Sequence, residues 1–122
     1  MKILILDDDR ERHDAFEKVL GSQYVVHTYD LDRAADAVKS GAPFDLALLD
    51  HDLGTVGNGL HFAEWLTCVD ADRRPAQVIV HSWNIPAADR MVDVLRKAGM
   101  PVRSETFGRD LLQQLREMCS LV

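Results

Sequence analysis

FDLALLDHDLG, residues 44–54, is the stretch that decides the fold of this chain. Its apolar part is typical of a strand that is buried on both faces of a parallel sheet, and we expect that strand over residues 45–50. The strand ends at Asp50, His51 and Asp52, and a glycine-rich segment follows over residues 54–59. Ionisable groups at the carboxyl end of a buried strand are typical of the ligand-binding edge of an open α/β sheet.

Four further apolar runs predict strands at residues 3–6, 24–29, 77–82 and 101–104. Because Pro101 opens the last run, we expect that strand at an edge of the sheet. Apolar residues at helical spacing predict helices over residues 10–20, 31–40, 60–69, 86–98 and 111–119. This alternation predicts a flavodoxin-like, doubly wound (βα)5 three-layer sandwich, with a parallel sheet of order 2-1-3-4-5.

The bulk composition narrows the class of protein. The chain has 122 residues and a net charge of -6, with Asp+Glu 20 against Lys+Arg 14, so it offers no basic surface for nucleic acid. No apolar run approaches the roughly 18 residues that span a bilayer, and Asp7 interrupts the first one too early for a signal peptide. Cys68 and Cys119 are predicted to be free thiols. We expect one cytoplasmic domain over residues 1–122, with no attached effector domain.

In the expected strand order the first and third strands are neighbours. Asp7 and Asp8 should therefore meet Asp50 and Asp52 at one edge of the sheet. Like charges about 4 Å apart repel by roughly 4 kcal/mol at an effective dielectric near 20, so protons or a cation must offset them. Hard carboxylate oxygens suit Mg²⁺ (or Mn²⁺), and beside such a metal Asp50 is a candidate nucleophile toward phosphoryl groups. The plainer alternative is that these aspartates only cap a helix and form a turn.

Two histidines follow neighbouring predicted strands. His51 and His81 could act as general base and general acid on a phosphodiester, although a structural imidazole bonded to loop backbone fits equally well. His13 and His27 are better explained as surface residues of a helix and a strand. Asn84 could cap the helix that begins near Pro86, or its amide could bind a ligand phosphate.

Three segments carry a resemblance to a known family. LILDD at residues 4–8, DLALLD at 45–50 and VIVHS at 78–82 resemble a response-regulator receiver domain, and the likeness in length and element order extends over the whole chain. The resemblance implies that Asp7 and Asp8 bind Mg²⁺ and that Asp50 accepts a phosphoryl group. It further implies that Asp52 adds a metal ligand through its backbone and that Ser82 contacts the phosphoryl group.

The chain departs from the receiver pattern in two places. Receivers carry a lysine near the end of the fifth strand, whereas residues 102–107 read VRSETF, so that Arg103 is the candidate substitute for phosphate binding. The usual Pro-Gly-x-x-Gly after the phosphoacceptor is also replaced. LDHDLG at residues 49–54, together with HSWN at 81–84, is similar to cyclic-phosphate processing receivers. Members of that family are proposed to act on cyclic phosphate ends or nucleotides.

Three functions remain open from the sequence. The first is an atypical receiver that takes a phosphoryl group on Asp50 from a histidine-kinase phosphodonor. The second is a metal-assisted phosphoesterase that acts on a phosphate-containing small molecule through His51 and His81. The third is a degenerate receiver kept as a protein-interaction module. A dimer is compatible with each of them, and the substrate or kinase is not encoded in any motif.

Overall fold

The computed structural model describes residues 1–41, 43–54 and 57–120. The strands in these residues are β1 (Lys2–Leu6), β2 (Tyr24–Thr28), β3 (Leu46–Leu49), β4 (Val78–Val80) and β5 (Val102–Ser104). The helices are α1 (Arg10–Leu20), α2 (Leu31–Ser40), α3 (Gly59–Thr67), α4 (Ile85–Lys97) and α5 (Arg109–Ser120), with a 3-10 turn η1 (Ala71–Arg73). Thr55 and Val56, which belong to the predicted glycine-rich segment, lie outside the described residues.

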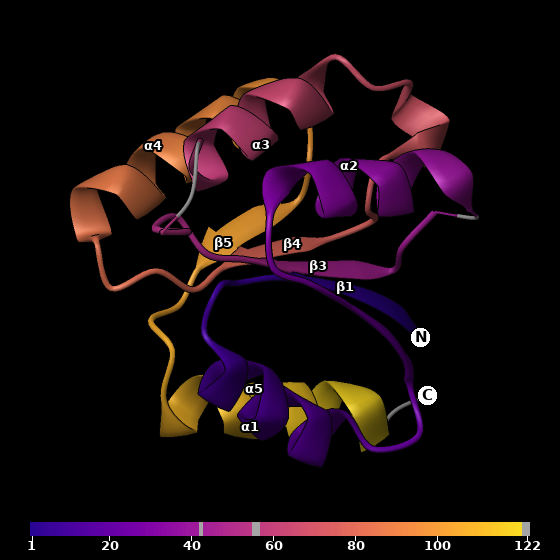
Figure 1. The fold of residues 1–122 in the computed structure, drawn as a ribbon, viewed down its shortest axis with the longest axis vertical. Helices are drawn as coiled ribbons and strands as arrows, with labels where there is room; N and C mark the ends of the chain where they lie inside the picture. The colour runs from indigo at the N-terminus through magenta and orange to yellow at the C-terminus, as the bar shows by residue number, and fades with distance from the viewer. Residues whose placement is uncertain (42, 55–56, 121–122) are drawn as a thin grey trace.

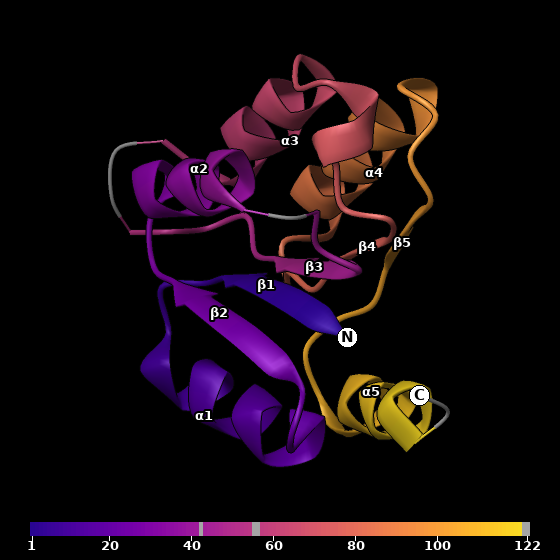
Figure 2. The same cartoon turned by 90° about the vertical axis from the view of Figure 1, so that its right-hand side faces the viewer.

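The strands form one parallel sheet of order β2-β1-β3-β4-β5 within the described part of the chain, which confirms the predicted flavodoxin-like fold. The sheet lies between two helical layers: α1 and α5 cover one face, and α2, α3 and α4 cover the other (Figures 1 and 2). β5 occupies an edge of the sheet, as the proline at its start predicts.

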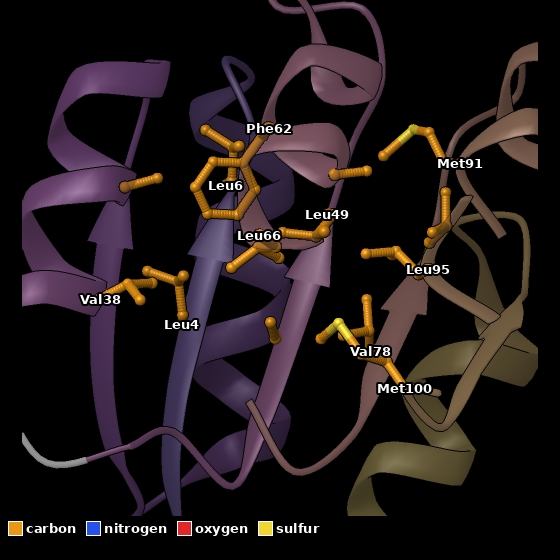
Figure 3. Close-up of a cluster of buried hydrophobic side chains, with 14 of the residues drawn as sticks. Leu4, Leu6, Val38, Leu49, Phe62, Leu66, Val78, Met91, Leu95 and Met100 are labelled. Atoms are coloured by element: carbon orange, nitrogen blue, oxygen red, sulfur yellow. The ribbon is translucent and has the colours of Figure 1, made fainter. Parts of the chain in front are cut away.

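Alternation along each strand supplies both faces of the sheet with apolar side chains. Ile3 and Ile5 of β1 belong to the core cluster that includes residues of α1 and α5. Leu4 and Leu6 belong to the larger cluster under α2, α3 and α4, which Figure 3 shows in close-up with Phe62 of α3. Because each fully buried side chain of this kind contributes about 1.5–3 kcal/mol, the two clusters fix the strands and hence the sheet edge above them.

Side-chain caps define where two of the helices near the sheet edge begin. Asp9 accepts hydrogen bonds from the backbone N–H groups of Glu11 and Arg12 at the start of α1. Asn84 Oδ1 accepts from Ala87 N at 3.3 Å at the start of α4, so Asn84 has the capping role that the sequence left open. Of the three aspartates after β1, Asp9 is therefore the one that caps the helix.

Two further expectations concern membranes and thiols. In residues 1–41, 43–54 and 57–120, no helix combines the length and the apolar character needed to cross a bilayer. Cys68 and Cys119 are both free; Cys68 is exposed and Cys119 is half-buried. Burial raises the pKa of the Cys119 thiol, so it is the less reactive of the two.

Candidate functional site at the carboxyl edge of the sheet

The candidate site lies where β1, β3 and β4 end together. The strand register brings the residues that follow these strands, Asp7, Asp50 and His81, to one edge of the sheet. Backbone hydrogen bonds continue the ladder past the strand ends: Asp50 N donates to Leu6 O at 2.9 Å, and His81 N donates to Leu49 O at 2.9 Å. The sheet backbone therefore fixes where these side chains start.

Asp7, Asp8 and Asp50 form an acidic cluster. Each offers a carboxylate oxygen, and these oxygens lie within 4.8 Å of one another. Asp7 is 0% exposed and Asp50 is 5% exposed, whereas Asp8 reaches the surface. The loop after β3 lies against Asp8, because a Cβ at Gly54 would stand 2.8 Å from Asp8 Oδ2, and Gly54 has a φ of +63°. Of the four carboxylates predicted to converge, these three do so, whereas the Asp52 carboxylate is 67% exposed and pairs with His51.

Arg12 of α1 reaches into this cluster, which the sequence did not predict. Its Nε donates to Asp7 Oδ2 at 2.7 Å, and its Nη2 donates to Asp7 Oδ1 at 2.8 Å and to Asp50 Oδ2 at 3.1 Å. Further ion pairs join Arg12 to Asp8 at 3.7 Å and to Asp9 at 3.3 Å. The one signal in the sequence was an arginine in the first turn of the helix that follows the aspartates.

The protonation equilibria of the cluster follow from burial and these contacts. Burial alone would raise the pKa of Asp7, but hydrogen bonds from His81 and Arg12 outweigh it and hold that pKa well below its usual range. Burial and the Asp7 charge raise the pKa of Asp8 and also that of Asp50. The hydrogen bond to Asp7 raises the pKa of Arg12 further. Asp7 is therefore the fixed anion of the cluster, and Asp8 and Asp50 bind protons more readily.

His81 is a buried partner of Asp7. Its Nε2 lies 2.8 Å from Asp7 Oδ2, and both side chains are 0% exposed. Since a carboxylate only accepts, Nε2 carries the proton and donates. His81 Nδ1 is buried with no hydrogen-bond partner in the part of the chain that is described. The ring packs edge-on against Phe16 of α1 at 5.1 Å between centroids.

His51 takes a different direction from the end of β3. Its Nδ1 lies 2.8 Å from Asp52 Oδ1, and the His51 side chain is 10% exposed against 67% for Asp52. Because the carboxylate accepts, the Nδ1 position carries a proton, and the neutral form of this ring has its lone pair on Nε2. The start of α3 packs directly on this segment, where Gly59 N donates to His51 O at 2.8 Å.

Comparison with known proteins identifies the family. The family model for the cyclic-phosphate processing receiver domain matches residues 2–97. The chain belongs to this family. No curated protein sequence matches the chain.

Solved receiver structures share the fold of this cyclic-phosphate processing receiver domain at low sequence identity. The Mn(2+)-bound form of response regulator Rcp1 has a TM-score of 0.73 at 18% identity, covering 98% of this chain and 93% of that one. The Francisella response regulator 1452 receiver domain has a TM-score of 0.71 at 15% identity, covering 98% and 93%. The signal receiver domain of a DNA binding response regulator from Colwellia psychrerythraea 34H has a TM-score of 0.69 at 19% identity, covering 100% and 99%.

The remaining predicted site residues of this receiver domain do not join the acidic cluster through the contacts observed. Ser82 is 1% exposed, and its Oγ accepts from Asn84 N at 3.0 Å. Arg103 donates to Gln114 Oε1 at 2.9 Å and lies 3.7 Å from Glu105. The phosphate-binding roles of Ser82, Asn84 and Arg103 stay predictions, as does the metal-ligand role of Asp52.

The expectation that His13 and His27 are simple surface residues is wrong for His13. This side chain is 1% exposed, since it lies on the buried side of α1, and its Nε2 is 2.8 Å from the backbone oxygen of Asp7. His13 Nδ1 contacts His27 Nδ1 at 2.7 Å, and His27 Nε2 contacts Glu17 Oε2 at 2.5 Å. Hydrogen bonding to the backbone and to a second imidazole is what allows a polar ring at this position.

The donor set of the cluster fits a hard divalent cation. Asp7, Asp8 and Asp50 supply three negative charges when ionised and Arg12 supplies one positive charge, which leaves a formal charge of -2. All three aspartates offer oxygen, the ligand atom that Mg²⁺ and Mn²⁺ prefer. The surface position of Asp8 gives such an ion a side of approach.

Proposed function

We propose that this receiver domain carries out divalent-cation-dependent chemistry on phosphate groups at the acidic cluster, with cyclic phosphates as its substrate class. The observation that supports the proposal is the His51–Asp52 pair, 2.8 Å apart, which directly follows Asp50 of the cluster. A carboxylate that fixes the tautomer of a neighbouring imidazole is a common arrangement for a group that transfers protons.

The proposed metal site consists of Asp7, Asp8 and Asp50, with a backbone ligand from Asp52. Mg²⁺ or Mn²⁺ held there would neutralise charge on the phosphate oxygens of the substrate. The solved structure of response regulator Rcp1, which has the same fold, is a Mn(2+)-bound form, which supports a divalent ion in this domain. The formal charge of -2 on the three carboxylates and Arg12 gives the same indication from this chain alone.

In the proposed reaction His51 handles the proton. Its Nε2 accepts a proton from a water molecule as the water oxygen bonds to phosphorus, and Asp52 stabilises the imidazolium that forms. One P–O ester bond of the ring breaks, and the released ribose oxygen takes a proton from solvent. The product is a phosphomonoester. A positioned base of this kind contributes about 10²–10⁴-fold in rate.

His81 has a different role in this proposal from the one first considered. Its side chain is 0% exposed and hydrogen bonded to Asp7, so it does not reach substrate without displacement from the core. We therefore place His81 as a positioning residue, which holds Asp7 in the orientation needed for the cation. This leaves His51 as the proposed proton-transfer histidine. The partner is a phosphate-bearing small molecule, and the cytoplasm is the proposed compartment.

A second candidate function is supported by the position of Asp50 itself. Asp50 directly follows the central strand β3, and its Oδ2 lies 3.1 Å from the Arg12 guanidinium. A carboxylate at this position, beside Arg12 and the proposed divalent cation, is suited to phosphorylation by a histidine-kinase phosphodonor. In that case the domain is a phosphorelay receiver, and acetyl phosphate or beryllofluoride should modify Asp50 in the presence of Mg²⁺.

The deciding experiment is a product assay with 2′,3′- and 3′,5′-cyclic nucleotides, followed by ³¹P NMR with and without Mg²⁺ or Mn²⁺. We expect phosphomonoester to form only with metal, and His51→Ala to slow its formation by about 10²–10⁴-fold. Asp8→Asn should raise the metal concentration required for turnover. Asp36→Asn, an exposed change on α2, should leave the rate of product formation and its metal dependence unchanged. Turnover by His51→Ala at the wild-type rate would refute the role of His51.

A negative result in the product assay can be interpreted if phosphorylation of Asp50 is measured in parallel. If no cyclic nucleotide is opened but acetyl phosphate labels Asp50, the second candidate function is correct and the enzymatic proposal is not. If neither reaction occurs while Mg²⁺ raises the melting temperature, the metal site stands without either chemistry. Absence of all three responses would contradict the whole proposal and favour an interaction module.

A further inference from the structure

Arg12 occupies the centre of the acidic cluster. One of its nitrogens, Nη2, lies 2.8 Å from Asp7 Oδ1, 3.1 Å from Asp50 Oδ2 and 3.7 Å from Asp8 Oδ1. A single positive group therefore touches an oxygen of each of the three carboxylates. That is the position from which an ion shared by these carboxylates would contact them.

We propose that Arg12 is a built-in counter-cation that competes with the divalent metal for the acidic cluster. In the metal-free protein the guanidinium offsets one of the three negative charges, and entry of the metal displaces it from Asp8 and Asp50. The inference deepens the proposed function and rests on it, because it describes how metal binding at that site is regulated.

Distances explain why the two cations exclude one another. Mg²⁺ binds carboxylate oxygens at about 2.0–2.1 Å in octahedral geometry. Arg12 Nη2 lies 3.7 Å from Asp8 Oδ1 and 3.1 Å from Asp50 Oδ2, so it occupies the space from which a metal would contact these two oxygens. A guanidinium and a divalent ion at contact distance also repel each other, more strongly in this partly buried site than in bulk water. One of the two must leave.

The contacts of Arg12 differ in strength, which indicates how it would move. The pair with Asp7 is bidentate, through Nε at 2.7 Å and Nη2 at 2.8 Å, and Asp7 is fully buried. The contact with Asp8 is long, at 3.7 Å, and both side chains are partly exposed, 24% for Arg12 and 35% for Asp8. Displacement should therefore begin on the solvent side, at Asp8, which is also where a hydrated ion arrives.

Nearby arginines supply the matched controls. Arg103, the arginine first considered for phosphate binding, is committed to Gln114 and Glu105. Arg10 is exposed at the start of α1, on the same helix as Arg12. A change at Arg10 removes the same charge from the same helix without touching the contacts of the cluster.

The test compares Mn²⁺ binding by calorimetry in wild type, Arg12→Gln and Arg10→Gln. We expect Arg12→Gln to bind Mn²⁺ about tenfold more tightly or better, and Arg10→Gln to bind like wild type. Without metal, Arg12→Gln should melt at a lower temperature than wild type, and Mn²⁺ should raise its melting temperature by more. Equal or weaker Mn²⁺ binding by Arg12→Gln, with wild type binding normally, would overturn the competition but leave the proposed metal site intact.

A second measurement needs no variant, in case Arg12→Gln does not fold. In ¹H–¹⁵N spectra of the wild-type protein, the Arg12 Nε–H signal should shift on addition of Mg²⁺, while the Arg103 Nε–H signal should stay in place. An unmoved Arg12 signal at a Mg²⁺ concentration that saturates the site overturns the inference. If neither wild type nor Arg12→Gln binds Mn²⁺, both the competition and the metal part of the proposed function fail.

Discussion

Replacement of Gly59 by alanine should destabilise the protein, although the intrinsic preference of a helix for alanine points the other way. Gly59 is the first residue of α3, where α3 meets the end of β3. A Cβ at this position would stand 2.1 Å from the backbone oxygen of Asp50, 2.8 Å from His51 Cα and 2.8 Å from Met91 Cε. Two of these neighbours are backbone atoms of the candidate site, which a rotamer change cannot move away.

The magnitude follows from three contributions. Inserting a methyl group into a packed site costs about 1–3 kcal/mol, and weakening the Gly59 N to His51 O hydrogen bond costs about 1 kcal/mol more. Alanine is about 1 kcal/mol better than glycine in a helix interior, which offsets part of this. We expect the free energy of unfolding of Gly59→Ala to fall by about 1–3 kcal/mol. Metal binding should weaken too, since Asp50 must shift.

Urea denaturation followed by circular dichroism measures this change. The matched control is Gly108→Ala, just before α5: a Cβ there meets nothing within 4 Å, so the substitution has no steric cost and should lower the free energy of unfolding by less than about 1 kcal/mol. If Gly59→Ala is as stable as Gly108→Ala, then helix propensity outweighs the close approach and the reasoning is refuted.

Three further outcomes can be measured directly. Loss of the buried imidazole in His81→Ala leaves Asp7 without one of its partners and should lower the free energy of unfolding by about 3 kcal/mol in urea; a loss below about 1 kcal/mol would contradict the buried pair. Phe16→Ala removes a fully buried ring from between α1 and the sheet and should cost about 3–5 kcal/mol by the same assay, with unchanged stability as the contrary result. Burial raises the pKa of the Cys119 thiol and shields it, whereas Cys68 is exposed. A disulfide reagent should therefore label Cys68 first and reach Cys119 faster as pH rises, and the reverse order would contradict this difference in burial.

The fold could be predicted from the sequence because the apolar patterns of strands and helices are local features of the chain. Residues 46–49, for example, are apolar at every position, which suits a strand covered by helices on both sides. Once the strand order is known, topology alone brings Asp7 and Asp50 together, since each directly follows one of two neighbouring strands. The acidic part of the site therefore required no side-chain detail.

The rest of the site depends on tertiary contacts that no spacing encodes. An arginine in the first turn of a helix is usually solvated, so the position of Arg12 after the aspartates was too weak a signal to predict its contacts with the cluster. Its reach depends on how α1 packs over the end of β1. The direction taken by a side chain just after a strand is equally undetermined. His51 and His81 therefore appeared equivalent in the sequence. In the structure, His51 pairs with the exposed Asp52, and His81 pairs with the buried Asp7.

The segment between β4 and α4 contains an intrinsic fluorophore, Trp83. Trp83 lies between the buried Ser82 and the capping Asn84, and it is 68% exposed. An indole open to solvent emits at long wavelength and is readily quenched by acrylamide. Trp65, in α3, packs partly buried against the core and supplies an internal reference within the same spectrum. Ligand binding at this edge of the sheet can therefore be followed in the unlabelled protein through the emission of one residue.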